Sequence, residues 1–220
     1  MLSPHFKLAV IDYLYFFKRD YPLKSSLKLV SDKYKLSGDE RSMLFRGTAM
    51  EAVIKKRKSK IIQSPVPDSD YMIDGYNVIR TIGSYLIGNL VFVSMDGFLR
   101  DASEIHKKSI KEDVIYKAID MILIALKNIE AKSVLFLLDE PISKSGELAK
   151  HINQELDHIS LNGEAKTVHS PDYHLKKSKS GVICTSDSII IDECQCKVFD
   201  FAKYILEINY SPDFLIVTNF

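Results

Sequence analysis

The sequence predicts an α/β protein in which an all-helical N-terminal module is followed by a mostly parallel sheet flanked by helices. Three observations support this. Residues 5–57 carry apolar side chains at helical spacing, and "QSPVPDSD" (63–70) reads as a proline-containing linker. From Tyr71 onward, short apolar strands alternate with amphipathic helices, which is typical of a parallel sheet. We therefore expect a helical domain over residues 1–60, a linker over 61–70 and an α/β domain over 71–220.

Three helices are expected in the N-terminal part. "HFKLAVIDYLYFFKRDY" (5–21) repeats apolar residues every three or four positions, and Pro22 ends that helix. "LKSSLKLVSDKYKL" (23–36) is amphipathic, and Ser37 with Glu40 forms a capping box that starts a third helix. Two short helices joined by a glycine-containing turn resemble a helix-turn-helix, although many small helical domains share this shape.

Charge is distributed unevenly along the chain. Residues 1–60 hold fourteen Lys or Arg against six Asp or Glu, whereas the remainder holds sixteen against twenty-three. A basic front and an acidic back suit a protein that attracts a polyanion with one part and holds metal with the other, but two domains with differently solvated faces would show the same asymmetry. The densest basic run, "KKRKSK" (55–60), is suited either to neutralising phosphates or to solvating a helix end.

The α/β part alternates regularly. Strands are expected at "YMID" (71–74), "LVFVS" (90–94), "SVLFLLD" (133–139), "AKTVHS" (165–170), "GVICTSD" (181–187) and "DFLIVTN" (213–219). Helices are expected over 77–87, 111–129, 145–159 and 196–208. In open parallel sheets the functional crevice lies beyond the carboxyl ends of the strands.

Carboxylates follow the expected strands. Asp74, Asp139 and Asp187 each end a strand, Asp96 follows another, and Asp192 lies five residues beyond Asp187. One such aspartate is more typical of a helix cap or a turn. Three at one sheet edge would repel one another unless a divalent cation neutralised them. Mg²⁺ or Mn²⁺ prefers such oxygen ligands, and a carboxylate-bound ion can support phosphodiester hydrolysis.

Two motifs carry a resemblance to a known family. "IDGYNVI" resembles the opening strand and helix of NYN domains, a branch of the PIN-like nucleases, and "VICTSDSIII" resembles the later Thr/Ser-x-Asp element. The resemblance implies an α/β sandwich that binds Mg²⁺ or Mn²⁺ and hydrolyses RNA. It implies that Asp74 and Asp187 bind metal and that Asn77 orients a water or the substrate. Asp139 is assigned by position alone.

The whole chain also resembles an uncharacterised prokaryotic family that joins a helical domain of unknown function to a PIN-like domain. "YPLKSSLKLVSDKYKLSGDERSMLFR" carries the first half of this likeness, and "IDGYN", "MDGFLRD" and "LLDEPISKSGELA" carry the second.

Several polar residues are candidates for binding substrate. Ser143 and Ser145 precede an expected helix, where hydroxyls either cap the helix or help to bind phosphate. Arg100 is a candidate phosphate clamp or an ion-pair partner of Asp96 or Asp101. Lys176 and Lys177 lie in a basic stretch before the expected strand 181–187, which ends in aspartate. They are candidate substrate contacts, or else part of a solvated loop.

Other classes of function lack support. No apolar run reaches the roughly 20 residues that span a membrane, and the N-terminus lacks signal-peptide features, so a cytoplasmic protein is expected. Cys184, Cys194 and Cys196 lack zinc-site spacing. No P-loop, dinucleotide or α/β-hydrolase motif occurs. A metal-dependent ribonuclease is the leading hypothesis. The alternatives are an inactive nucleic-acid-binding or regulatory protein and a small-molecule phosphate enzyme.

Overall fold

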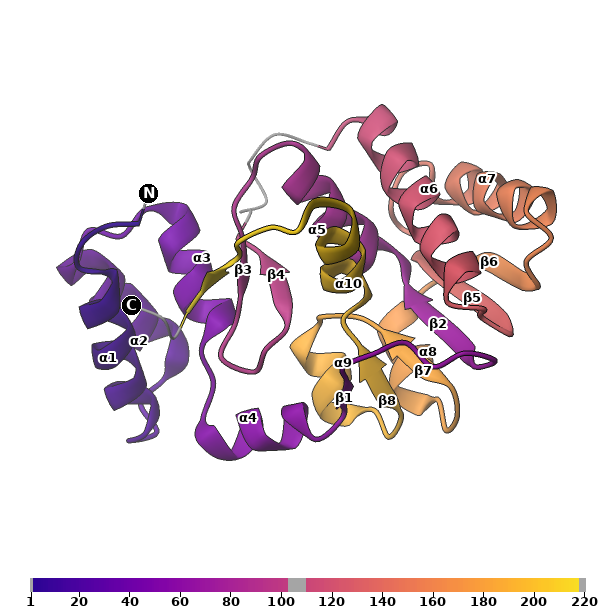
Figure 1. Ribbon diagram of the computed structural model, residues 1–220. Coiled ribbons are helices and arrows are strands. Elements are labelled where there is room, and N and C mark those ends of the chain that lie inside the picture. Colours follow the sequence, from indigo (N-terminus) through magenta and orange to yellow (C-terminus); the bar gives the residue numbers. More distant parts are fainter. Residues whose placement is uncertain (1, 103–109, 218–220) are drawn as a thin grey trace. The chain divides into compact units, whose positions relative to one another are not determined.

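The computed structural model describes residues 2–102 and 110–217, shown as the coloured ribbon in Figure 1. The chain divides into two compact units. The first comprises residues 1–58, 84–109 and 213–220, and the second comprises 59–83 and 110–212. A division near residue 60 was expected, but the sequence did not indicate that two later segments would join the N-terminal helices.

The first unit combines four helices with a small sheet. The helices are α1 (Phe6–Phe17), α2 (Leu23–Lys33), α3 (Gly38–Gly47) and α4 (Glu51–Lys58). The sheet has the order β4-β3-β9, formed by Leu99–Asp101, Val91–Val93 and Leu215–Ile216. The capping box at the start of α3 is confirmed, since Ser37 and Glu40 exchange both hydrogen bonds.

The first unit has its own apolar core, built from helices and strands together. Phe6, Tyr13 and Met43 of the helices share this core with Phe92 of β3 and with Val217. The strands expected within 90–94 and 213–219 correspond to β3 and β9, which belong to this small sheet and not to the six-stranded one. Their apolar side chains cover the helices, so the N-terminal module is not all-helical in its packing.

The second unit is built on a six-stranded sheet. Its order is β1-β8-β7-β2-β5-β6, and every neighbouring pair is parallel. The strands are β1 (Ile61–Ile62), β2 (Asp70–Asp74), β5 (Ser133–Asp139), β6 (Gly163–Val168), β7 (Val182–Cys184) and β8 (Lys197–Phe199). The expected α/β class with a parallel sheet is confirmed.

Helices follow most of these strands. They are α5 (Gly75–Leu86), α6 (Glu112–Asn128), α7 (Ser145–His158), α8 (Pro171–Lys177), α9 (Ser188–Glu193) and α10 (Phe201–Tyr210). Helix α7 packs on β5 and β6 and contacts α6, as Figure 1 shows, and α8 packs on β2 and β5. None of the described helices is long and apolar enough to cross a membrane.

Three short strands were not expected from the sequence: β1 and β8 of the six-stranded sheet and β4 of the small sheet. β1 lies inside the expected linker and pairs with β8, whose residues were expected to begin a helix at 196. The helix begins only at Phe201, because the Asp200 carboxylate accepts a hydrogen bond from the backbone N–H of Lys203 and caps it there. Strands of two or three residues are too short to show a period of their own.

Candidate functional site

The site begins at Asp74, the last residue of the central strand β2. β2 is flanked by β5 and β7, and the Asp74 side chain is only 6% exposed. Gly75 follows at once. A Cβ on Gly75 would lie 2.5 Å from Leu138 Cδ2 and 2.9 Å from the Leu137 carbonyl oxygen. The glycine therefore lets α5 start directly against β5, which places Asp74 at the carboxyl edge of the sheet.

Hydrogen bonds join the two motifs that the sequence analysis singled out. The Thr185 hydroxyl donates to Asp74 Oδ2 at 2.7 Å. The Ser186 backbone N–H donates to Asn77 Oδ1 at 2.9 Å, and the Ser186 hydroxyl approaches the same oxygen at 3.2 Å. The segment after β7 thus holds both Asp74 and Asn77. Among the described residues, Asp74 Oδ1 and the Asn77 NH₂ group have no hydrogen-bond partner.

Three carboxylates raise the pKa of a fourth, Asp74, at this edge, and we call Asp74, Asp139, Asp172 and Asp187 the acidic cluster. Burial, the largest cause, and the charges of Asp187, Asp172 and Asp139 together raise the pKa of Asp74 to about 7, against the lowering effect of the Thr185 hydrogen bond. Burial and the charges of Asp187 and Asp139 also raise the pKa of Asp172. The acidic cluster therefore favours an added proton or cation.

Each member of the acidic cluster follows a different strand. Asp139 ends β5, Asp172 lies in the first turn of α8 after β6, and Asp187 caps α9 after β7. Asp187 Oδ1 accepts from the N–H groups of Ile189 at 2.7 Å and Ile190 at 3.3 Å. The cap and the acidic-cluster roles considered for Asp187 thus coexist in one side chain.

Sequence reasoning missed three side chains here. Asp172 lies four residues after the end of β6, so it follows a strand as the other acids do. It was not predicted because "SPDY" (170–173) is typical of a loop. Thr185 was seen only as part of a motif. Arg80 is exposed on α5, and its guanidinium carbon lies 5.6 Å from the centroid of the Tyr76 ring. Burial raises the pKa of Tyr76, Arg80 lowers it and Asp139 raises it, so Arg80 stands near the acidic cluster.

Asp96 and Arg100 form a buried ion pair within the first unit. Both lie in the first unit, where Arg100 donates two hydrogen bonds of 2.9 Å to the Asp96 carboxylate and Arg57 donates another of 2.8 Å. Burial alone would raise the pKa of Asp96, but Arg100, Ser94 and Arg57 together lower it to about 2. Of the two roles considered for Arg100, the structure therefore shows the ion pair with Asp96, and the Asp96 carboxylate is occupied by two arginines.

Asp192 is not among the aspartates that raise the pKa of Asp74. It lies within α9, and its backbone carbonyl, with those of Ile191 and Cys194, accepts from the Lys60 ammonium group. The basic run 55–60 is therefore partly structural. Lys60 caps the carboxyl end of α9, and Arg57 is held by Asp96.

The remaining predicted contacts divide between exposed and anchored positions. Ser143 is exposed in the turn before α7, but Ser145 is buried and its hydroxyl donates to the Glu140 carbonyl. Lys176 forms an ion pair of 3.5 Å with Glu193, which ties α8 to α9. Lys177 is exposed, and the described residues give it no ion-pair partner.

The donor chemistry fits a hard divalent cation, although the described residues form no ready-made metal cage. Among them, no three His, Cys, Asp or Glu side chains are grouped closely enough to hold a metal ion. All four members of the acidic cluster offer carboxylate oxygens, which Mg²⁺ and Mn²⁺ prefer. Mg²⁺ is commonly held by one or two carboxylates together with waters and substrate phosphates, so a three-ligand cage is not required.

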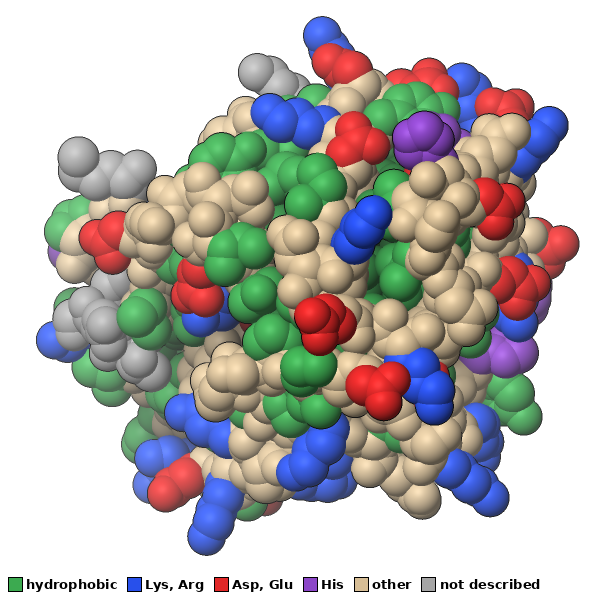
Figure 2. Space-filling model, turned by 45° about the vertical axis from the view of Figure 1, so that its right-hand side comes forward, with side chains coloured by type: hydrophobic (Ala, Val, Ile, Leu, Met, Phe, Trp, Pro, Cys, Tyr) green, Lys and Arg blue, Asp and Glu red, His purple; other side chains and the backbone are tan. Residues whose placement is uncertain are grey.

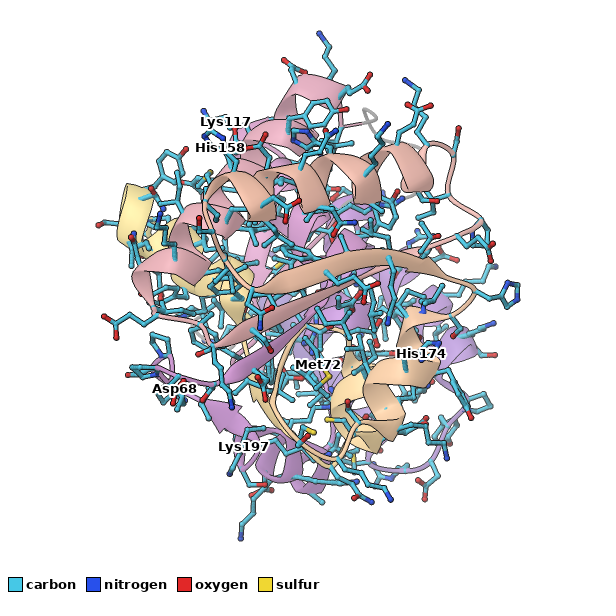
Figure 3. The ribbon with its side chains drawn as sticks, turned by 90° about the vertical axis from the view of Figure 1, so that its right-hand side faces the viewer. Asp68, Met72, Lys117, His158, His174 and Lys197 are labelled. Atoms are coloured by element: carbon cyan, nitrogen blue, oxygen red, sulfur yellow. The ribbon has the colours of Figure 1, made fainter. Side chains whose placement is uncertain are left out.

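The opposite end of the sheet has a different character. A cavity of about 330 Å³ there is lined by residues including Asp68, Asp70 and Lys197. Figure 3 places Asp68 and Lys197 away from His174, which belongs to α8. The cavity mixes one cation with two acids and lies at the amino ends of β2, β7 and β8.

Comparisons with known proteins find matches along most of the chain. A family model described as "Domain of unknown function (DUF5616)" matches residues 64–204, and one described as "Protein of unknown function (DUF434)" matches residues 5–60. The chain is 33% identical over 199 residues to "Uncharacterized protein MJ0935" of Methanocaldococcus jannaschii. The aligned region covers 90% of this chain and 91% of that protein. No solved structure matches.

Proposed function

The chain belongs to the DUF5616 family, and from the acidic cluster we propose that it is a PIN-like, metal-dependent ribonuclease that hydrolyses RNA phosphodiester bonds. One observation carries the proposal. Burial and three neighbouring carboxylates raise the pKa of Asp74 to about 7 at the carboxyl edge of a parallel sheet. Such strongly perturbed groups cluster at functional sites, and this edge is where open α/β sheets place them.

The expected cofactor is Mg²⁺ or Mn²⁺. Asp74 and Asp187 would hold it, with Asp139 and Asp172 adding negative charge around it. When bound, such an ion polarises a phosphate and activates water for attack. Binding the ion would also displace the proton that Asp74 retains near neutral pH.

The chain's own side chains have separate tasks in this proposal. Thr185 fixes the orientation of Asp74 through its 2.7 Å hydrogen bond. Ser186 holds the Asn77 carbonyl oxygen, which leaves the Asn77 NH₂ group to donate to a phosphate oxygen or a water. Arg80, exposed and without a carboxylate partner among the described residues, is placed to bind a neighbouring phosphate.

Net charge alone does not identify the surface that binds RNA. Lys, Arg, Asp and Glu side chains are interspersed on the face shown in Figure 2. Within the basic run, Lys55, Lys56 and Lys58 remain exposed, while Arg57 is buried. RNA binding in this proposal therefore depends on particular residues beside the acidic cluster, with these exposed lysines as a secondary attraction.

The decisive experiment compares matched carboxylate variants. Purified protein, Asp74→Asn and Asp120→Asn are incubated with end-labelled RNA, with and without Mn²⁺. Asp120 is exposed on α6 and serves as the control. We expect cleavage that needs Mn²⁺, that Asp74→Asn abolishes and that Asp120→Asn retains. Cleavage that survives Asp74→Asn would overturn the proposal. RNA binding without any cleavage would favour an inactive binding protein instead.

A further inference from the structure

Helix α8 presents an exposed aromatic ring and an exposed amine beside the acidic cluster. Tyr173 is 61% exposed and directly follows Asp172, a member of that cluster. Lys177 is also exposed, and the described residues give it no ion-pair partner. Residues four apart lie on the same face of a helix, so the ring and the amine are neighbours on one surface.

The helix itself is firmly anchored, so neither side chain is needed to hold it. Leu175 is fully buried, and the Ser170 hydroxyl accepts from the Tyr173 backbone N–H at 3.3 Å. Lys176 pairs with Glu193 of α9, which α8 also contacts. Figure 3 shows His174 on this helix, and its ring makes a T-shaped contact with Tyr173 at 5.8 Å between centroids. α8 therefore offers a fixed platform.

A lone exposed aromatic ring is common on protein surfaces and needs no explanation. Here, however, the surroundings are specific. Ile189 is 53% exposed two residues after Asp187, so a second large apolar side chain stands beside another member of the acidic cluster. Lys179 is exposed just beyond α8. Apolar surface and positive charge thus accompany a strongly acidic edge that would otherwise repel a polyanion.

We infer that α8 recognises single-stranded RNA, with an unpaired base stacked on Tyr173 and the adjoining phosphate bound by Lys177. The combination of a stacking ring with a nearby cation is the chemistry by which proteins bind single strands. Bases within a duplex are already stacked on one another and cannot use such a ring. The inference rests on the proposed function, because it names the substrate class of the same site.

Binding is measured separately from cleavage. Anisotropy of a fluorescein-labelled 12-nucleotide RNA is followed in EDTA at low salt, alone and annealed to its complement. The proteins are the natural chain, Tyr173→Ala, Tyr173→Phe and Tyr210→Ala, whose target tyrosine is exposed on α10. We expect Tyr173→Ala to weaken single-strand binding at least about fivefold, while Tyr173→Phe and Tyr210→Ala keep it. Duplex binding should not change. Circular dichroism melts confirm that each variant folds.

The outcomes separate the two proposals. Equal single-strand affinity in Tyr173→Ala and the natural chain, or no single-strand binding at all, overturns the inference even if Mn²⁺-dependent cleavage occurs. A loss in Tyr173→Phe as large as in Tyr173→Ala also overturns it, because the ring would not be the contact. Tyr173-dependent binding without cleavage supports the inference and refutes the ribonuclease.

Discussion

The hydroxyl of Thr185 donates a 2.7 Å hydrogen bond to Oδ2 of the buried Asp74. The two residues are 111 positions apart in sequence and follow neighbouring parallel strands, β7 and β2. The bond lowers the pKa of Asp74, but burial and the charges of three other aspartates outweigh it and bring that pKa to about 7. The folded protein thus keeps a carboxyl group that ionises only near neutral pH.

Asp74 should make the protein less stable as pH rises. Its pKa in the folded protein lies above the ordinary aspartate value of 3.8, so the stabilising effect is fully present below about pH 4 and is lost as pH rises through about 7. The size of this effect is on the order of 4 kcal/mol. Asp74→Asn should remove it. Urea unfolding measured from pH 4 to pH 8 should show that the free energy of unfolding depends less on pH in the variant, and that the variant is more stable than the natural chain at pH 8.

The control for that series is Asp120→Asn, which changes an exposed carboxylate on α6. It should follow the natural chain at every pH. If Asp74→Asn shows the same pH dependence as the natural chain, the raised pKa of Asp74 is refuted.

Thr185→Val should raise the pKa of Asp74 further, because the hydroxyl that stabilises its ionised form is removed. The same change leaves the ionised Asp74 carboxylate without its hydrogen-bond donor, so the free energy of unfolding should fall by about 1–3 kcal/mol at pH 8. Carboxyl ¹³C shifts followed by NMR titration report the pKa directly. Thr185→Ser keeps the hydroxyl and should stay close to the natural chain. A lower pKa in Thr185→Val would contradict the assigned role.

A divalent cation should stabilise the protein in a pH-dependent way. Mn²⁺ competes with the proton on Asp74, so the rise in Tm on adding it should be larger at pH 8 than at pH 5.5. At a hundredfold excess over Kd the gain is about 2.7 kcal/mol. Differential scanning fluorimetry measures the shift against matched ionic strength. Asp172→Asn should reduce it, and no shift at either pH would count against a metal site.

Gly75 and Gly146 form a matched pair for testing how Asp74 is positioned. A Cβ at Gly75 meets Leu138 and the backbone oxygen of Leu137, so Gly75→Ala should destabilise the protein by about 1–3 kcal/mol. A Cβ at Gly146, in the first turn of α7, meets nothing within 4 Å. Gly146→Ala should therefore be neutral or stabilise by up to about 1 kcal/mol. Thermal melts of both variants check the prediction, and equal stability of the two would refute the close packing after β2.

Much of the architecture was predictable from local pattern. Apolar runs and amphipathic periods identified the helices and the longer strands, because burial imposes those periods wherever an element is long enough to repeat them. The capping box at Ser37 was readable for a similar local reason. The short strands β1 and β8 could not be predicted, because two or three residues are too few to show a period.

The amino-acid sequence was enough to predict that Asp74 and Asp139 end two strands and that Asp187 follows a third, since a strand and the acid after it are local features. Only the tertiary structure decided which acids belong together. The structure shows that Asp172 belongs to the acidic cluster and that Asp96 pairs with Arg57 and Arg100 within the first unit. The physical reason is that strand order, and thus the field around each carboxylate, depends on contacts between residues far apart in the chain. No local pattern records those contacts.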